Sequence, residues 1–431
     1  MQSTTPLSPS PACPVVAPMP VAPFAGPPAC VAAWTAVVRA HLPHLSTPVA
    51  SVLALWSLGM VLAHSCGLTS VACTVAHLLD IKEGTARQRL REWCYAKEHK
   101  RGAHRQEWDV TTCFGPLLRW VLTWWAPGEH RLALAMDATT LGQRFTVLAI
   151  SVVYRGCAIP VAWTVVAATE KGAWRPHWED LFRHLRGSVP PDWDVLVCAD
   201  RGLYARWLYR HIVTVGWHPF LRINQGGLFR IRGQARWRSL TSAAPQPGHG
   251  WSGGVRCFKT QPLDCTLLAR WDAPHEEPWL IVTDLAPVSA DACWYSLRAW
   301  IECGFKDTKR GGWHWEQTKM TDPARAERLW LAIAVATLWV LSAGSAQTDL
   351  GSASSLPDDP LTSATGATPT RRSRPRLLSV FRRGLLTLVV ALLKGDGLVF
   401  GQFRPEPWPR GTPLQRVSFP EDQGGSLAAA A

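Results

Sequence analysis

The segment from Arg131 to Ile223 limits the possible folds more than any other part of the sequence. Three runs rich in apolar and β-branched residues come first, separated by short breaks typical of hairpins: 131–136, 144–154 and 159–168. A helix, a short buried strand, a second helix and a further strand are predicted to follow, at 174–185, 195–199, 204–215 and 218–223. This order predicts an α/β fold with a mixed sheet covered on both faces.

The composition favours a folded, basic protein of several domains. The chain has 431 residues, 47% of them hydrophobic, and 45 Lys and Arg against 32 Asp and Glu give a net charge of +13. Such an excess of positive charge favours a polyanionic partner, either nucleic acid or an anionic membrane. The 12 cysteines show no CxxC or CxxH spacing, so neither a zinc site nor a disulfide scaffold is expected. Reduced thiols in a cytoplasm are the expectation.

Changes in composition divide the chain around this sheet. We expect a disordered lead at 1–30, a helical, DNA-binding region at 31–128, the first part of the core at 129–225, a β-rich insertion at 226–288, core helices at 289–343, a linker at 344–370, a helical region at 371–403 and a loose tail at 404–431. The apolar runs 48–62 and 329–343 are shorter than the roughly 18–20 residues of a membrane span, and we expect buried helices. No secretory signal is supported at the N-terminus.

The helical N-terminal region contains one pattern that suggests DNA binding. An apolar-periodic run from Leu68 to Leu79 is followed by a short break at 80–84 and a basic segment at 85–105. A helix, a short turn and a basic helix are the outline of a helix-turn-helix motif. A pair of helices with a solvated basic face has the same pattern, and both interpretations remain open.

A helix predicted over Tyr295–Lys309 carries the most distinctive polar pattern. Tyr295, Arg298, Glu302 and Lys309 fall within about 60° of one another if successive residues turn by about 100°. A carboxylate with two cations beside it suits phosphate and metal chemistry. The alternative is an amphipathic surface helix that carries ordinary ion pairs.

Two aspartates add acidic groups to this pattern. Asp137 and Asp200 each come directly after an apolar run predicted to be a buried strand, and sites collect at strand ends in open α/β sheets. Together with Glu302 they would form a cluster of three carboxylates, whose repulsion calls for a divalent ion such as Mg²⁺ or Mn²⁺. Taken singly, either aspartate could instead form a turn or cap a helix.

These residues together resemble a known family. The spacing Tyr295-(2)-Arg298-(3)-Glu302-(6)-Lys309 is similar to the Y-(2)-R-(3)-E-(6)-K signature of bacterial insertion-sequence transposases of the IS-four type, and LAMDAT around Asp137 and VCADRG around Asp200 resemble their two aspartate motifs. The resemblance covers about residues 130–342. It implies an RNase H-like catalytic core in which Asp137, Asp200 and Glu302 bind two Mg²⁺ ions, with Mn²⁺ as a substitute. It also implies that Tyr295, Arg298 and Lys309 hold DNA phosphates.

The implied activity is DNA cleavage and strand transfer in cut-and-paste transposition. The expected partner is double-stranded DNA, both the inverted repeats at the ends of the element and the target, and a homodimer is expected to join the two ends. The implied location is a bacterial cytoplasm, at the nucleoid, with no membrane partner. A structure-specific nuclease of the same fold, a catalytically silent DNA-binding derivative and, remotely, a membrane protein remain as alternatives.

Overall fold

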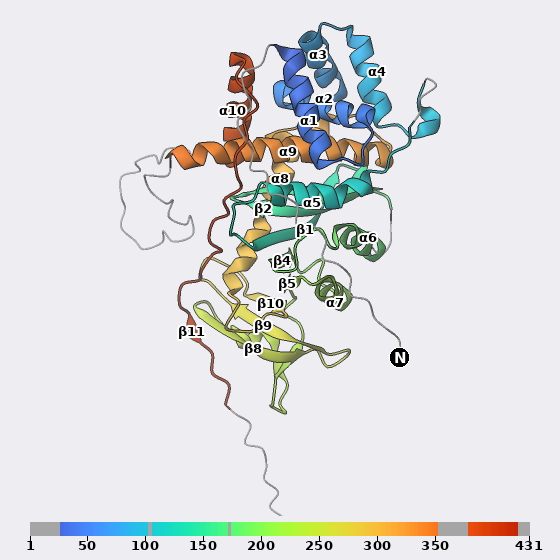
Figure 1. Cartoon of the computed structure of the whole chain (residues 1–431). Helices are drawn as coiled ribbons and strands as arrows, with labels where there is room; N and C mark the ends of the chain where they lie inside the picture. The colour runs from blue at the N-terminus through green and yellow to red at the C-terminus, as the bar shows by residue number, and fades with distance from the viewer. Residues whose placement is uncertain (1–25, 102–105, 171–173, 352–377, 421–431) are drawn as a thin grey trace, which may run out of the picture.

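The computed structural model describes residues 26–101, 106–170, 174–351 and 378–420, apart from the side chains of 347–351. Figure 1 shows a helical N-terminal part above a central sheet, with the strands of the insertion below it. The mixed sheet and the helical N-terminal region predicted from the sequence are therefore confirmed. Of the lead predicted at 1–30, residues 1–25 lie outside the described residues, and a helix begins at Pro27. Of the linker predicted at 344–370, residues 344–351 instead continue the preceding helix, and 352–370 lie outside the described residues.

The first half of the sheet is built by five strands, β1 (Arg131–Leu141), β2 (Phe145–Tyr154), β3 (Cys157–Ala167), β4 (Asp194–Ala199) and β5 (His218–Arg222). Their order in space is β3-β2-β1-β4-β5. The first three form antiparallel hairpins, whereas β1, β4 and β5 run parallel. Every residue of β2 is buried, which explains its continuous run of apolar and β-branched residues.

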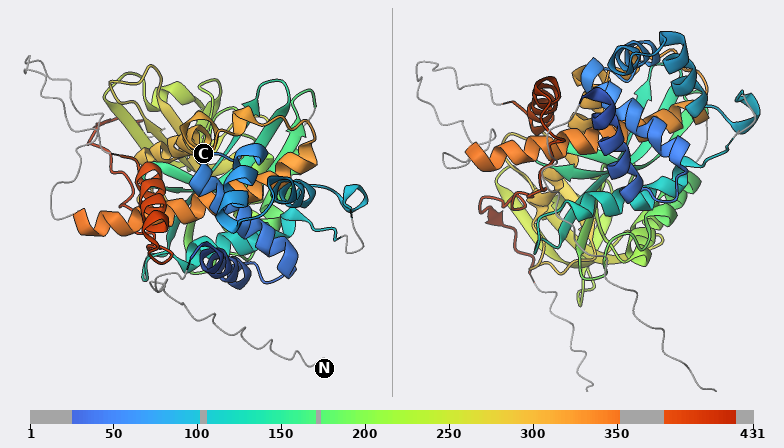
Figure 2. Two further views of the ribbon diagram at one scale, coloured as in Figure 1. Left: turned by 90° about the horizontal axis from the view of Figure 1, so that it is seen from above. Right: turned by 45° about the horizontal axis from the view of Figure 1, so that its top comes forward.

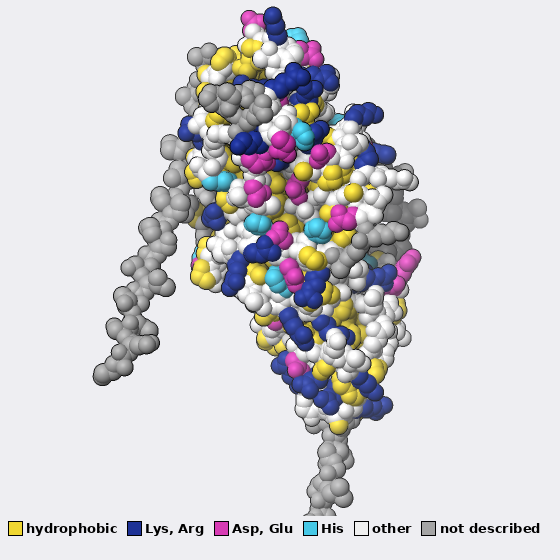
Figure 3. Space-filling model, turned by 90° about the vertical axis from the view of Figure 1, so that its right-hand side faces the viewer, with side chains coloured by type: hydrophobic (Ala, Val, Ile, Leu, Met, Phe, Trp, Pro, Cys, Tyr) yellow, Lys and Arg dark blue, Asp and Glu magenta, His cyan; other side chains and the backbone are white. Residues whose placement is uncertain are grey.

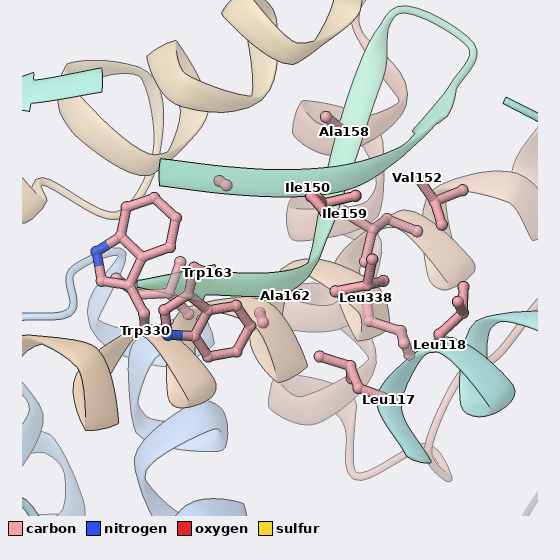
Figure 4. Packing of buried hydrophobic residues seen from close by; sticks show 14 of the residues in the cluster. Leu117, Leu118, Ile150, Val152, Ala158, Ile159, Ala162, Trp163, Trp330 and Leu338 are labelled. Carbon is pink, nitrogen blue, oxygen red and sulfur yellow. The ribbon is translucent and has the colours of Figure 1, made fainter. Parts of the chain in front are cut away.

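Five helices pack around these strands: α5 (Phe114–Thr123), α6 (Arg175–Leu185), α7 (Arg206–Val215), α8 (Trp300–Lys306) and α9 (Pro323–Gly351). Figure 4 shows side chains of α5 and α9 meeting the β2–β3 hairpin, with Trp330 beside Trp163 on one side and Leu117 and Leu118 near Leu338 on the other. The Trp163 side chain is fully buried, and its indole N–H donates to the Glu327 carbonyl at 2.9 Å. Truncation of such a residue to alanine costs about 3–5 kcal/mol.

Helix α9 is the central helix of the protein. It contacts α2 (Thr47–Ala63), β3 and α10 (Val380–Lys394), and Figure 2 shows it running beneath the N-terminal helices and crossing α10. The crossing is close, because a Cβ at Gly384 would lie 1.8 Å from the Val340 carbonyl oxygen. Within the described part of the chain, α9 is the one helix long and apolar enough to cross a membrane. However, 94% of its most apolar 18-residue stretch is buried inside the protein.

The N-terminal part consists of α1 (Pro27–His41), α2, α3 (Leu68–Leu79) and α4 (Glu83–Trp93). Helix α3 coincides with the predicted apolar run, and Asp80 ends it with a left-handed backbone (φ 53°). The basic helix is shorter than the predicted segment, because α4 ends at Trp93 and a short 3₁₀ turn follows at Lys97–His99. Helices α3 and α4 pack on each other.

The insertion extends the central sheet. Its strands are β6 (Leu228–Ile231), β7 (Arg238–Ser239), β8 (His249–Cys257), β9 (Leu263–Arg270) and β10 (Trp279–Thr283). Because β10 pairs with both β5 and β9, the described residues form a continuous sheet of eleven strands. The β-strands predicted for this segment are present, and the pairing of β10 with β5 joins them to the core.

The C-terminal segment differs from the loose tail that we expected from Arg404. Residues 404–420 run along the core to the insertion, where β11 (Gln415–Arg416) pairs with β8. Trp408 anchors the segment: the Arg131 guanidinium lies 3.8 Å from the centre of its ring, and Trp294 meets it edge-on at 4.8 Å. These contacts involve residues more than a hundred positions away, which explains why the sequence of the segment did not indicate them.

Candidate active site

The segment predicted as one helix over Tyr295–Lys309 has three conformations. A 3₁₀ stretch, η4 (Ala292–Ala299), leads into α8, and a π-helical turn, η5 (Asp307–Gly311), follows it. Lys309 leaves the helical region with ψ −130°, ahead of the two glycines Gly311 and Gly312. The prediction of a regular helix is therefore wrong, and a uniform turn of 100° per residue does not describe how the polar side chains lie.

Three carboxylates nevertheless converge at one point, the guanidinium of Arg298. Its Nη2 lies 2.6 Å from Asp137 Oδ2 and 3.6 Å from Asp200 Oδ2, and its Nη1 lies 2.5 Å from Glu302 Oε1. The carboxylates come from three elements: strand β1, the residue after β4, and α8. The convergence predicted from the sequence is thus present, with an arginine at its centre.

The two aspartates occupy different backbone environments. Asp137 does not follow a strand, as we expected, but lies inside β1 opposite Ala149 of β2. The strand continues because Ala138–Leu141 pair with the start of β2 in a longer hairpin than predicted. Asp200 does follow its strand, and its Oδ1 accepts hydrogen bonds from the N–H groups of Gly202 (2.9 Å) and Leu203 (3.1 Å). Asp200 therefore combines the turn role with a place in the carboxylate cluster.

Burial and charge oppose each other in this cluster. Burial raises the pKa of the Asp137 carboxyl, and the nearby Arg298 guanidinium and a hydrogen bond from the Ala138 N–H partly offset the rise. Burial alone would lower the pKa of Arg298, but the carboxylates, Asp137 foremost, hold it above its usual value. The Arg298 side chain is 14% exposed. The cluster is thus a partly desolvated site in which the positive charge is firmly retained.

Lys309 lies beside the cluster rather than in it. Its Nζ donates to Thr139 Oγ1 on β1 at 2.8 Å, and burial lowers the pKa of its ammonium group. A cavity of about 560 Å³ opens between these elements, and its lining includes Asp137, Glu302, Lys306, Lys309 and Arg310. The lining therefore contains both acidic and basic side chains, with Glu302, Lys306, Lys309 and Arg310 on one continuous segment.

Lys306, Arg310 and Thr139 were missed in the sequence analysis. Lys306 stands four positions after Glu302, a spacing that marks it as a neighbour of the glutamate on a helix. Arg310 stands eight positions after Glu302 and reaches the cavity from the π-helical turn that follows α8, which the sequence did not indicate. Thr139 follows Asp137 by two positions, on the same face of β1. Spacing could therefore have indicated Lys306 and Thr139, but not Arg310.

Tyr295 lies apart from the other signature residues. Its side chain is packed among Phe220, Ile281 and neighbouring apolar residues, and the ring meets Trp279 edge-on at 5.3 Å. The residue is 6% exposed, and burial raises the pKa of its phenol to about 12. Its visible role is to fix η4, and with it Arg298, against the sheet.

The donor atoms of the cluster fit a hard divalent cation. All three acidic side chains offer carboxylate oxygens, the ligands that Mg²⁺ and Mn²⁺ prefer. Their arrangement is that of an arginine-bridged cluster: among the described residues, no three His, Cys, Asp or Glu side chains are positioned to hold a metal ion together. The chemistry of the site fits the ion, and the conformation shown here holds Arg298 instead.

No curated protein matches the chain. Among solved structures, the cryo-EM structure of the piggyBac transposase synaptic complex with hairpin DNA is similar with a TM-score of 0.36 and 11% sequence identity, covering 74% of this chain and 76% of that chain. Residues 130–339 match the family model described as the transposase DDE domain. The matched region includes Asp137, Asp200 and Glu302, and the match supports a DDE transposase.

Proposed function

We propose that the protein is a DNA transposase of the IS-four type, which cleaves the ends of its element and joins them to target DNA with the help of divalent metal ions. The observation that carries this proposal is the convergence of Asp137, Asp200 and Glu302 on a single point within 3.6 Å of one guanidinium. These residues lie within the part of the chain that matches the transposase DDE domain.

The strand order supports an RNase H-like core as part of this proposal. Antiparallel β3-β2-β1 continues into parallel β4 and β5, and the carboxylates come from the central strand β1 and the neighbouring β4. The helix that carries Glu302 packs against β1 and β3 and brings the third carboxylate to the same edge. Such an arrangement gathers acidic side chains from distant parts of the sequence at one place.

The proposed metal ligands are Asp137, Asp200 and Glu302, with two Mg²⁺ ions that Mn²⁺ can replace. When bound, such a pair of ions activates the attacking oxygen and stabilises the leaving oxygen of phosphoryl transfer. Lys309, held by Thr139, presents an ammonium group to a DNA phosphate, and Arg298 offers the fork geometry of a guanidinium. Tyr295, named by the signature as a further phosphate contact, supports the backbone from which Arg298 extends.

Basic side chains line two separate cavities of the described residues. Lys306, Lys309 and Arg310 line the cavity beside Glu302. A second cavity of about 410 Å³, between α4 and the loop before α9, is lined in part by four cations: Arg87, Arg91, Lys319 and Arg325. Figure 3 also shows Lys and Arg gathering on the lower end of the molecule, over the insertion. This distribution supports double-stranded DNA as the partner, bound through its phosphates.

The remaining parts of the proposal concern assembly and location. Two protomers are needed to bring two ends of an element together, so the proposed active form is a homodimer on DNA. The proposed location is the bacterial cytoplasm, at the nucleoid, without a membrane partner. Size-exclusion chromatography with light scattering, with and without end DNA, tests the stoichiometry directly.

Strand transfer on defined DNA tests the function. Purified protein is incubated with duplexes that carry the inverted repeats flanking its gene, and we expect cleaved and joined products with Mg²⁺ or Mn²⁺ and none with a chelator. Asp137→Asn and Glu302→Gln should lower the rate by at least about 100-fold, because each removes a metal ligand. Asp192→Asn, at a carboxylate that is 61% exposed, is the matched control and should leave the rate unchanged.

The products distinguish the alternatives. Hydrolysis of DNA without joining would assign the protein to the structure-specific nucleases. Specific binding without any turnover would identify a silent DNA-binding derivative. Full activity of the Asp137→Asn or Glu302→Gln variant would refute the proposed metal site.

A further inference from the structure

One positive charge holds three negative ones together at the candidate active site. The two terminal nitrogens of Arg298 contact oxygens of Asp137, Asp200 and Glu302 at 2.6, 3.6 and 2.5 Å. Without Arg298, three carboxylates would face each other in a partly buried place, and their repulsion would push them apart or cause one to take up a proton. The guanidinium is therefore what keeps the cluster assembled in this conformation.

A divalent ion would need the same oxygens. Mg²⁺ binds carboxylate oxygens at about 2.0–2.1 Å in a nearly octahedral arrangement. Asp137 Oδ2 and Glu302 Oε1 already accept hydrogen bonds from Arg298, so an ion that bound them at that distance would meet the guanidinium. Two cations at one point repel each other strongly in a partly desolvated site. Arg298 and the metal ion thus compete for the cluster.

Arg298 also has an unused donor. Its Nε is buried and finds no hydrogen-bond partner among the described residues, although its two Nη atoms are bonded. A buried N–H without a partner costs about 1–3 kcal/mol, so the bridged state is not the best environment for this side chain. If the side chain left the carboxylates, a phosphate group could offer oxygens to Nε and Nη together, in the paired geometry that guanidinium groups favour.

We propose that Arg298 is the resident counter-ion of the carboxylate cluster and that DNA phosphate draws it away, which frees the carboxylates for the metal ions. The inference rests on the proposed function and adds a mechanism of control to it. Metal ions would bind weakly to the DNA-free protein and strongly to the DNA complex. Because binding free energies are linked, metal ions would strengthen DNA binding by the same factor.

Metal affinity of the DNA-free full-length chain tests this competition. Free Mn²⁺ is measured by electron paramagnetic resonance during titration of the wild type and of Arg298→Gln. We expect Arg298→Gln to bind Mn²⁺ at least tenfold more tightly than the wild type, because the competing cation is gone. Arg201→Gln is the matched control: Arg201 adjoins Asp200 in sequence but pairs with Glu277 at 2.6 Å, and its loss should leave Mn²⁺ affinity unchanged.

The double variant Asp137→Asn/Arg298→Gln separates failure of the inference from failure of the proposed function. Equal Mn²⁺ affinity in the wild type and Arg298→Gln, lost in the double variant, would overturn the competition and leave the metal site intact. If the Asp137→Asn substitution left Mn²⁺ affinity unchanged, the metal site itself would be refuted. If Arg298→Gln binds Mn²⁺ tightly and the double variant does not, the result supports both the metal site and the competition.

Thermal unfolding keeps the test usable if Arg298→Gln folds poorly. That variant should melt below the wild type in chelator and regain stability with Mn²⁺, because the ion restores the missing positive charge. Arg298→Lys keeps a charge on a single ammonium, which lacks the forked donors, and should bind Mn²⁺ with intermediate affinity. A Mn²⁺ response of Arg298→Lys no greater than that of the wild type would contradict the inference.

The coupling to DNA is measured last, with a duplex that ends in the inverted repeat and with Ca²⁺ in place of Mg²⁺ to limit turnover. Fluorescence anisotropy gives the DNA affinity with and without Ca²⁺. In the wild type we expect Ca²⁺ to raise the affinity at least tenfold, whereas in Arg298→Gln the factor should fall to about one. The same factor in both proteins would show that Arg298 does not couple the two ligands.

Discussion

Gly304 of α8 rests directly on Ala158 of β3. A Cβ at position 304 would lie 2.7 Å from the Ala158 Cβ and 3.3 Å from its carbonyl oxygen. Such close approach requires the absence of a side chain, and it sets the height of α8 above the sheet. Glu302, which contacts Arg298 at 2.5 Å, lies two residues earlier on the same short helix, so we expect its position to depend on this contact.

We predict that Gly304→Ala impairs strand cleavage more than it impairs folding. The added methyl group lifts α8 and displaces Glu302, and a shift of about 1 Å at a reacting centre lowers a rate by about 100-fold. The cost in stability should be about 1–3 kcal/mol, as for other overpacked sites. Cleavage rates and urea unfolding measure the two effects separately.

The control for this prediction is Gly84→Ala in α4, where an added Cβ meets no atom within 4 Å. It should leave cleavage unchanged and raise helix stability slightly. The double variant Gly304→Ala/Ala158→Gly removes the clash from the other side and should recover most of the activity. Wild-type cleavage by Gly304→Ala alone would show that this contact does not position Glu302.

Lys309 gives a prediction about DNA affinity. Its ammonium is fixed by Thr139 at the wall of the catalytic cavity, which suits a contact to one phosphate. Lys309→Ala should weaken binding of end DNA and reduce the slope of log affinity against log salt by about 0.9, the value for one lost contact. Anisotropy titrations at several salt concentrations measure this slope.

Two variants serve as comparisons for Lys309. Lys309→Arg keeps the charge and should retain most of the salt dependence. Lys394→Ala removes a lysine at the end of α10 and should change neither affinity nor slope. An unchanged slope in Lys309→Ala would rule out a phosphate contact at this position.

The local parts of the fold follow from sequence, and the non-local parts do not. The strands at 131–168 are predictable because β-branched residues and short breaks define hairpins locally. The pairing of β10 with β5, which joins the insertion to the core, depends on residues about sixty positions apart and has no local signal. Trp408, packed against Arg131, is a similar case at the C-terminus.

The candidate site shows the same division. The sequence pattern selected Glu302 and the two aspartates as candidates, but it placed Asp137 after a strand rather than inside β1. It could not show that Arg298 bridges them, because that contact depends on the change from 3₁₀ to α-helix at Trp300. The buried position of Tyr295 against Trp279 depends on the insertion, whose placement is itself non-local.

The cavity between α4 and the loop before α9 gives a further prediction. Arg87 and Lys319 are exposed at this cavity and come from two different parts of the fold. If duplex DNA lies across it, the double variant Arg87→Ala/Lys319→Ala should lower the salt slope by about 1.8. Arg183→Ala/Arg175→Ala removes the same charge from α6, where both arginines pair with acidic neighbours, and should have a smaller effect. Equal losses in the two double variants would indicate a general effect of net charge.

Asp307 gives a prediction about pH and stability. Burial raises the pKa of its carboxyl from 3.8 to about 6 in the folded protein, although Arg382 opposes the rise. Between about pH 4 and pH 6 the folded state keeps a proton that the unfolded state releases, so the free energy of unfolding falls as pH rises through this window. Above pH 6 the loss is constant, at most about 3 kcal/mol.

Asp307→Asn removes this titration while keeping the shape of the side chain. The variant should therefore be more stable than the wild type at pH 7.5, and the difference should vanish as the pH is lowered to 4. Urea unfolding at a series of pH values measures the two curves, with Glu98→Gln at an exposed position as the control that should follow the wild type. A constant difference between Asp307→Asn and wild type across this range would show that the Asp307 proton is not the cause, because only a group that titrates between pH 4 and 6 makes the curves converge.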